Sequence, residues 1–175
     1  MKSLPTNQSL GSSHRGRQLA LAWSTTDPVP AMLKVAFATD DRVAINQHFG
    51  ATVGFAIYAI DGEHAHLVQV AEFLSDPSSN AMDGNENKLA DKIDVLKGCA
   101  AVYCLAVGGS AVRQLLAAGI QPVRLDEEIN IEAQLTSLRQ AVRDGGIPWL
   151  DKLLRRQDEN DGSRFDRMAA EGWQE

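Results

Sequence analysis

One histidine of this chain, His48, lies in a predicted loop where its side chain is available to bind a ligand. His48 lies in the tetrapeptide Gln47-His48-Phe49-Gly50, between two apolar runs of strand-like composition. A histidine in such a connection has no local structural duty, whereas Phe49 can anchor the loop in the core and Gly50 can let the chain turn sharply. Neutral imidazole is a common ligand of iron, copper and zinc. The alternative is a structural role, in which His48 donates to a backbone carbonyl and shapes the loop.

A second candidate belongs to the nearly all-apolar run 100–107, which is typical of a strand buried on both faces. Cys104 lies toward the C-terminal end of this run, and ligand sites in open α/β sheets gather outside such ends. A thiolate is a natural ligand of iron–sulfur clusters, whereas the alternative for Cys104 is a small core residue. Cys99, at the other end of the run, is interpreted as structural.

The same run leads into a strand-to-helix turn at Gly108, Gly109 and Ser110. Its bare backbone amides and the positive end of the helix dipole suit an anion, and Arg113 could add charge. The alternative is a tightly packed turn in which Ser110 caps the helix. Because this turn and the His48 loop both follow strands of one sheet, we expect them to line one pocket at the same edge.

The rest of the sequence gives enzyme chemistry little support. It contains no nucleophile elbow, no His-Glu-x-x-His motif and no phosphate-binding loop ending in Gly-Lys-Ser/Thr, and the two cysteines do not form a Cys-x-x-Cys pair. His64 and His66 flank a predicted hairpin on one face, either as a surface metal pair or as a solvated edge. We therefore expect a binding protein and not an enzyme.

The elements that must position these residues alternate along the chain. A hairpin signal at Asp61-Gly62 joins two of the strands, and Asn85 and Asn130 are suitable helix caps. This pattern predicts an α/β fold, a single domain with a mixed, mostly parallel central sheet flanked by helices. The expected strands are 33–38, 55–60, 64–73, 100–107 and 121–125, and the expected helices are 86–97, 108–118 and 130–144.

Composition indicates one domain with two tails. The chain has 175 residues, of which 44% are hydrophobic, enough for a real core. We expect a flexible N-terminal tail over 1–32, in which 19–23 could form a short docking helix. The α/β domain should span 33–150. The charged C-terminal tail, 151–175, should contain one short helix.

Charge and cysteine content restrict the partners. A formal net charge of -6 argues against a nucleic-acid partner. No apolar run approaches the roughly 20 residues needed to cross a bilayer, so no membrane partner is expected. Two cysteines do not suggest a disulfide scaffold, and a reducing, cytoplasmic setting is the simplest interpretation.

Taken together, the segments Leu33–Thr39, Gln47–Gly50 and Phe55–Tyr58, with Val43, resemble the dinitrogenase iron–molybdenum cofactor biosynthesis family. The later stretch Tyr103–Leu115, with Phe165–Met168, is similar to the NifX-like branch. The resemblance covers residues 33–150 and implies a ribonuclease H-like topology. It also implies a carrier or chaperone without catalysis, which binds and transfers the iron–sulfur precursor of the nitrogenase cofactor, or the iron–molybdenum cofactor itself, during nitrogenase maturation.

The resemblance carries the family's cluster-contacting histidine onto His48, and Cys104 is a second candidate ligand. Two cysteines cannot form a cluster site with four cysteine ligands, so the cluster would arrive already built. The implied partners are the precursor-synthesising enzyme and the assembly scaffold. The alternative is a protein-binding regulatory module of nitrogen fixation that holds no cluster. The predicted cofactor-binding residues are His48, Phe49, Gly50, Gly108, Gly109, Ser110 and Arg113, with His48 and Cys104 as metal ligands.

Overall fold

The strand that leads toward His48, β2 (Leu33–Ala38), lies inside a six-stranded sheet, as its apolar sequence predicts. The computed structural model describes residues 18–20, 32–73 and 84–171. β2 pairs antiparallel with β4 and parallel with β6. The strand order is β1-β5-β4-β2-β6-β7, with β1 at Gln18–Ala20, β4 at Gly54–Ile60, β5 at Ala65–Glu72, β6 at Ala101–Cys104 and β7 at Gln121–Arg124.

The sheet is mixed, as predicted. β2, β5, β6 and β7 run in one direction, whereas β4 and the edge strand β1 run in the other. From β5 to β7, only β4 is reversed, which is the ribonuclease H-like topology. The C-terminal ends of β2 and β6 therefore lie at the same edge of the sheet, where ligand sites of such folds form.

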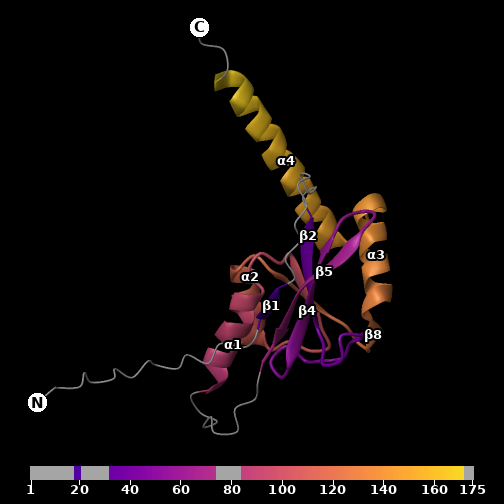
Figure 1. Cartoon of the computed structure of the whole chain (residues 1–175). Coiled ribbons are helices and arrows are strands. Elements are labelled where there is room, and N and C mark those ends of the chain that lie inside the picture. The colour runs from indigo at the N-terminus through magenta and orange to yellow at the C-terminus, as the bar shows by residue number, and fades with distance from the viewer. Residues whose placement is uncertain (1–17, 21–31, 74–83, 172–175) are drawn as a thin grey trace, which may run out of the picture.

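Helices cover both faces of this sheet (Figure 1). α1 (Gly84–Val95) and α2 (Gly109–Ala117) lie on one face, and α3 (Ile131–Asp144) lies on the other. Successive residues of β2 alternate between the two cores: Phe37 packs with α3, whereas Ala36 packs with α1 and α2. Burial on both faces explains why the strand is almost continuously apolar.

The loop after β2 is joined to the start of α3 by a small second sheet that the sequence did not reveal. β3 (Ala44–Ile45) pairs antiparallel with β8 (Ile129–Asn130). Asn130 caps α3 as predicted, because its side-chain oxygen accepts from the Glu132 amide at 2.9 Å and the Ala133 amide at 3.3 Å. This second sheet fixes one end of the segment that leads to His48.

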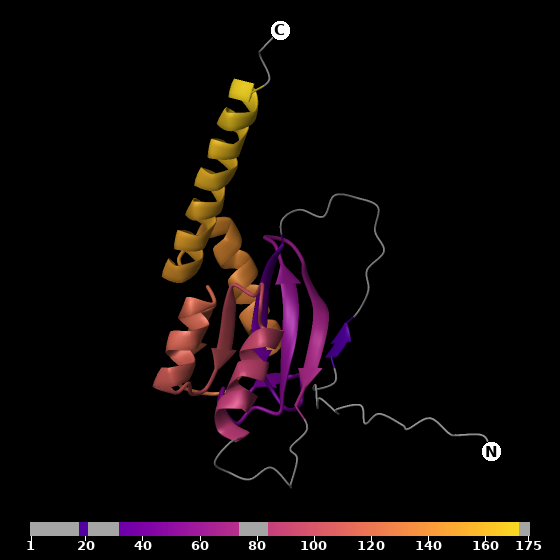
Figure 2. The same ribbon diagram turned by 90° about the vertical axis from the view of Figure 1, so that its left-hand side faces the viewer.

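The C-terminal prediction was wrong in length. α4 (Pro148–Glu171) has 24 residues and begins before the predicted boundary at Leu150, and it projects away from the sheet (Figures 1 and 2). Leu150, Leu153 and Leu154 pack on the α3 core, whereas 155–160 are exposed. Arg, Gln and Glu in that stretch are good helix formers, so the helix continues through 155–160 although none of these residues is buried. No helix in the described parts of the chain is long and apolar enough to cross a membrane.

Three other local predictions need correction. Leu19 and Ala20 were expected in a docking helix, yet they belong to β1 and pair with β5, because an open sheet edge offers their backbone hydrogen bonds. Asn85 is not a helix cap, since α1 already begins at Gly84. The sequence also predicts a loop over 75–85, of which Gly84 and Asn85 are helical instead. Its residues 75–83, the tail residues 1–17 and 21–31, and residues 172–175 lie outside the described residues.

Candidate functional site

The loop of residues 47–52, here named the His48 loop, exposes its histidine and buries its neighbour. Phe49 is fully buried and lies against Phe55, with ring centroids 5.6 Å apart. The His48 carbonyl accepts from the amides of Ala51 at 3.2 Å and Thr52 at 2.9 Å. Phe49 is thus the anchor that the sequence predicts, and its ring faces the core. Among the described residues, no hydrogen-bond partner of the His48 imidazole is found.

The His48 loop lies beside the segment that joins β6 to α2. The Phe49 amide donates to the Ala106 carbonyl at 2.8 Å, and the Leu105 amide donates to the Gln47 carbonyl at 3.0 Å. These bonds extend the parallel arrangement of β2 and β6 beyond the strands. The His48 loop and the glycine turn therefore stand at one edge of the sheet, as expected.

The start of α2 presents an open helix N-terminus at this edge. Its cap residue is Gly108, with no side-chain cap and no acidic residue in the first turn. Ser110 is not the cap; its hydroxyl accepts from the Gln114 side chain at 3.2 Å. A Cβ atom added to Gly108 or Gly109 would meet nothing within 4 Å, and neither glycine has a positive φ. The backbone does not require these glycines, and their amides are accessible.

Gly50 and Arg113 are also exposed, one in the His48 loop and the other on α2. Gly50 has no positive φ and an open space where a Cβ would stand, so the turn itself does not require glycine. Arg113 lies on α2, one turn after the open N-terminus. Both residues leave room for an approaching ligand.

Cys104 lies beneath the loop and within the core. It is fully buried, and its thiol donates to the Val123 carbonyl at 3.9 Å. Burial raises the pKa of Cys104 to about 11, although the nearby Phe49 amide lowers it. The thiol is therefore protonated at neutral pH, which favours the interpretation as a core residue; its role as a ligand stays a prediction. Burial likewise raises the pKa of Cys99 to about 11.

A network of carboxylates holds the segment that precedes the His48 loop. Asp40 accepts from the Asn46 side chain at 2.6 Å and from the Gln47 side chain at 3.2 Å. Asp41 accepts from the amides of Ala44 at 2.9 Å and Val43 at 2.8 Å, and these bonds lower the pKa of its carboxyl group. The sequence shows these carboxylates as a polar turn, but which of the following residues they bind becomes visible only in the fold.

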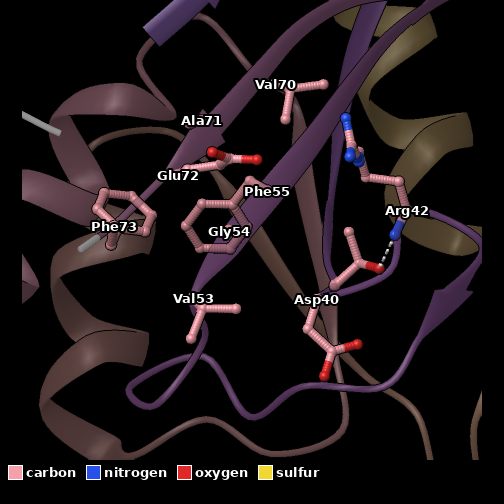
Figure 3. A pocket seen from close by; sticks show the side chains of 10 residues that line it. Asp40, Arg42, Val53, Gly54, Phe55, Val70, Ala71, Glu72 and Phe73 are labelled. Carbon is pink, nitrogen blue, oxygen red and sulfur yellow. Dashed lines mark hydrogen bonds between the residues drawn. The ribbon is translucent and has the colours of Figure 1, made fainter. Parts of the chain in front are cut away.

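A hollow of about 190 Å³ opens at the same edge of the sheet (Figure 3). Asp40 and Arg42 enter it from the loop after β2, and Glu72 comes from the end of β5. Arg42 has a φ of 62°, a left-handed conformation that is uncommon for a residue with a side chain. None of the predicted site residues lines this hollow. Its charges have both signs and do not define one class of ligand.

One functional candidate was missed in the sequence. Lys92 of α1 is buried, with 6% of its surface exposed, and its ammonium donates to the carbonyls of the His48 loop at Phe49 and Gly50. A signal existed, because Lys92 falls between Leu89 and Leu96 on the apolar stripe of its helix. A lysine on such a stripe needs a polar partner in the fold.

Exposed histidines also occur at the opposite edge, in the hairpin between β4 and β5. The rings of His64 and His66 stack with centroids 5.9 Å apart, and His64 Nδ1 is 3.6 Å from Asp61 Oδ1. Within the part of the chain that the structure describes, no group of three or more His, Cys, Asp or Glu side chains could hold a metal ion. A closed metal site is therefore not formed by these residues.

Known proteins are similar in sequence over most of the length of this chain. The family model described as "Dinitrogenase iron-molybdenum cofactor" matches residues 32–141, which include the His48 loop and α2. Protein NifX of Azotobacter vinelandii is 47% identical over 159 residues, covering 91% of this chain and 97% of the relative. Protein NifX of Klebsiella pneumoniae is 30% identical over 79% of this chain and 82% of the relative. The FeMo cofactor biosynthesis protein NifB of Frankia alni is 37% identical over 55% of this chain and 19% of its own length.

Proposed function

Because this chain belongs to the dinitrogenase iron-molybdenum cofactor family and is NifX-like over most of its length, we propose that it is a cluster carrier. Family membership supports a role in the biosynthesis or handling of the iron–molybdenum cofactor. The finer proposal is that the chain binds and transfers the iron–sulfur precursor of this cofactor, or the cofactor itself, without catalysis. Its partners would be the enzyme that makes the precursor and the scaffold on which the cofactor is assembled.

The observation that carries the proposal is the exposed His48 on a loop whose backbone is held by other elements. A carrier must bind and release, and one imidazole on the surface suits that task better than a cage of several ligands. The anchored Phe49 and the bond to Ala106 fix where the imidazole emerges. The cargo therefore meets a ligand whose position is already set.

The neighbouring helix N-terminus supports the same proposal. If the cargo is anionic, a local positive region is needed to hold it, because the domain as a whole is acidic. The uncapped amides at Gly109 and Ser110 supply one beside the His48 loop. Arg113 adds a positive side chain on the same helix. His48 would ligate the cargo, and these groups would hold its negative charge.

The test is anaerobic titration of the full chain with isolated iron–molybdenum cofactor and, separately, with its iron–sulfur precursor. Bound cluster is measured by visible absorbance and by iron counted per chain. His48→Ala should weaken binding at least about tenfold, since even indirect partners of metal ligands contribute that much. The matched control is His64→Ala, an exposed histidine at the opposite edge, which should bind as the wild type does.

Three outcomes decide between the alternatives. Equal affinity of the wild type and His48→Ala would remove His48 from the site. A wild-type chain that takes up no iron and stays colourless would refute the carrier and favour the protein-binding regulatory module. Cys104→Ser preserves size in the core; a changed cluster spectrum would make Cys104 a second ligand, and an unchanged spectrum would leave it in the core.

A further inference from the structure

α1 places a positive charge inside the core below the His48 loop. Lys92 is only 6% exposed, and it lies on a helix face whose other residues are apolar. Ile93 and Leu96 of that face pack with Phe49 and Phe55 in the core between the sheet and α1. Burying an ammonium among such residues is costly unless polar groups surround it.

The groups that surround the ammonium belong to the His48 loop and to the end of β5. Lys92 Nζ donates to the Phe49 carbonyl at 3.5 Å and also to the Gly50 carbonyl. It lies 5.5 Å from the centre of the Phe73 ring, which itself packs edge-on against Phe55. Lys92 therefore connects α1 to the two residues that directly follow His48.

These partners, two carbonyls and an aromatic ring, carry no formal charge that would neutralise Lys92. Among ion pairs between described residues, none involves Lys92. Burial and, to a smaller extent, the charge of the neighbouring Lys88 of α1 together lower the pKa of Lys92 to about 8. Lys92 is still mostly charged at neutral pH, so a cation that pairs with no carboxylate of the described residues lies directly under the loop.

We propose that Lys92 is a positioning residue for cargo binding, whose ammonium holds the Phe49 and Gly50 carbonyls so that His48 emerges in a fixed place. This inference rests on the proposed function, because the cargo is the cluster that His48 would ligate. The ammonium also contributes positive charge beside the position of an anionic cargo. Lys92 does not touch the cargo; it acts through the backbone of the loop.

A positioning role and a purely structural role predict different results for Lys92→Met. Methionine has a similar length and fills the same apolar space without a charge, so stability should be kept or increased. The loop loses the donor to its two carbonyls and should open more often. Stability and cargo binding would then change in opposite directions, as happens where a buried charge serves function.

The experiment uses the full chain and four variants, three of them at lysines. Amide hydrogen exchange is followed at Phe49, Ala51 and Thr52, whose amides donate within or next to the His48 loop. Exchange at these amides should be accelerated about tenfold in Lys92→Met, and affinity for isolated iron–molybdenum cofactor should fall about tenfold. Lys97→Met removes an exposed lysine with a surface ion pair to Asp94 and should change neither. Lys92→Arg retains charge and donors and should keep more binding than Lys92→Met.

Each outcome is decisive. Unchanged loop exchange and unchanged affinity in Lys92→Met would overturn the proposal. If Lys92→Met lowers the melting temperature as much as the core variant Ile93→Ala, Lys92 is a structural residue and the proposal is also overturned. If the wild type binds no cluster, the proposed function fails, whereas the exchange measurement still shows whether Lys92 holds the loop.

Discussion

The two edges of the sheet each expose histidines, but they do so in different surroundings. At the hairpin edge, His64 lies close to Asp61, and the hairpin carbonyls of Gly62 and Glu63 accept from the arginines Arg143 and Arg139 of α3. At the other edge, His48 emerges from a loop whose carbonyls accept from a buried lysine. The hairpin carbonyls accept from arginines that remain at least partly in water, whereas the carbonyls of the His48 loop accept from an ammonium that is buried.

This difference teaches that exposure alone does not identify a functional histidine. The hairpin arrangement is less costly in the case of Arg143, which is exposed and loses little hydration when it binds a carbonyl, whereas Arg139 is half-buried and its Nε finds no hydrogen-bond partner among the described residues. The arrangement under His48 is expensive and adds nothing that an apolar side chain could not supply for packing. A buried lysine beside an open helix N-terminus is a feature that a binding site would retain despite its cost. Each of the following tests compares this edge of the sheet with the hairpin edge.

The largest expected effect is on stability at alkaline pH. The pKa of Lys92 is about 8 in the folded chain against an ordinary value of 10.5. Between these values the unfolded chain binds more protons at this lysine, so the contribution of Lys92 to the free energy of unfolding should rise with pH, by up to about 3 kcal/mol. The thiols of Cys99 and Cys104, whose pKa is raised from 9.0 to about 11, act in the opposite direction above pH 9. Urea denaturation across this window should therefore show that the wild type and Lys97→Met gain stability relative to Lys92→Met. If the wild type and Lys92→Met change equally with pH, the buried charge makes no such contribution.

A smaller effect is expected from closing the approach to α2. Gly109→Leu adds a side chain where no atom lies within 4 Å of a Cβ, and leucine is the better helix former, so melting temperature should hold. Affinity for isolated iron–molybdenum cofactor should fall about tenfold, about 1.4 kcal/mol, because the side chain covers the open amides. Ala117→Leu, at the far end of the same helix, is the control. A cofactor affinity equal to that of the control would show that cargo does not approach α2.

The smallest effect is expected at the hairpin edge. The Asp61 carboxylate accepts from the amides of His64 at 2.6 Å and Glu63 at 2.7 Å, and these bonds lower its pKa. Its contribution to stability is therefore present above the ordinary value of 3.8 and is lost as the pH falls below it. Asp61→Asn should cost less than about 1 kcal/mol at neutral pH and leave cluster binding unchanged. Weakened binding in this variant would erase the contrast between the two edges.

Much of the fold follows from short-range patterns. The alternating strands of the first half, the apolar strand β6 and the Asn130 cap were all predicted, because each is encoded within a few neighbouring residues. The pairing of β3 with β8 was missed, since strands of two residues carry no periodic signal and depend on a partner far along the chain. The length of α4 was missed because its polar stretch 155–160 interrupts the apolar pattern and leaves only helix propensity as a signal.

The candidate site divides in the same way. The sequence itself determined that His48 follows a central strand, that Phe49 is available as an anchor, and that a glycine turn follows a parallel strand at the same edge. These are consequences of local composition and of the rule that parallel strands end together.

Only the tertiary structure decided which charges meet at that edge. Lys92 is buried because α1 docks with this residue facing the His48 loop, and Cys104 is protonated because β6 lies between two layers. Asp40 holds Gln47 because the loop after β2 folds back on itself. Each of these facts depends on the distance between groups in space, and hydration and Coulomb energies depend on such distances and not on the order of residues along the chain.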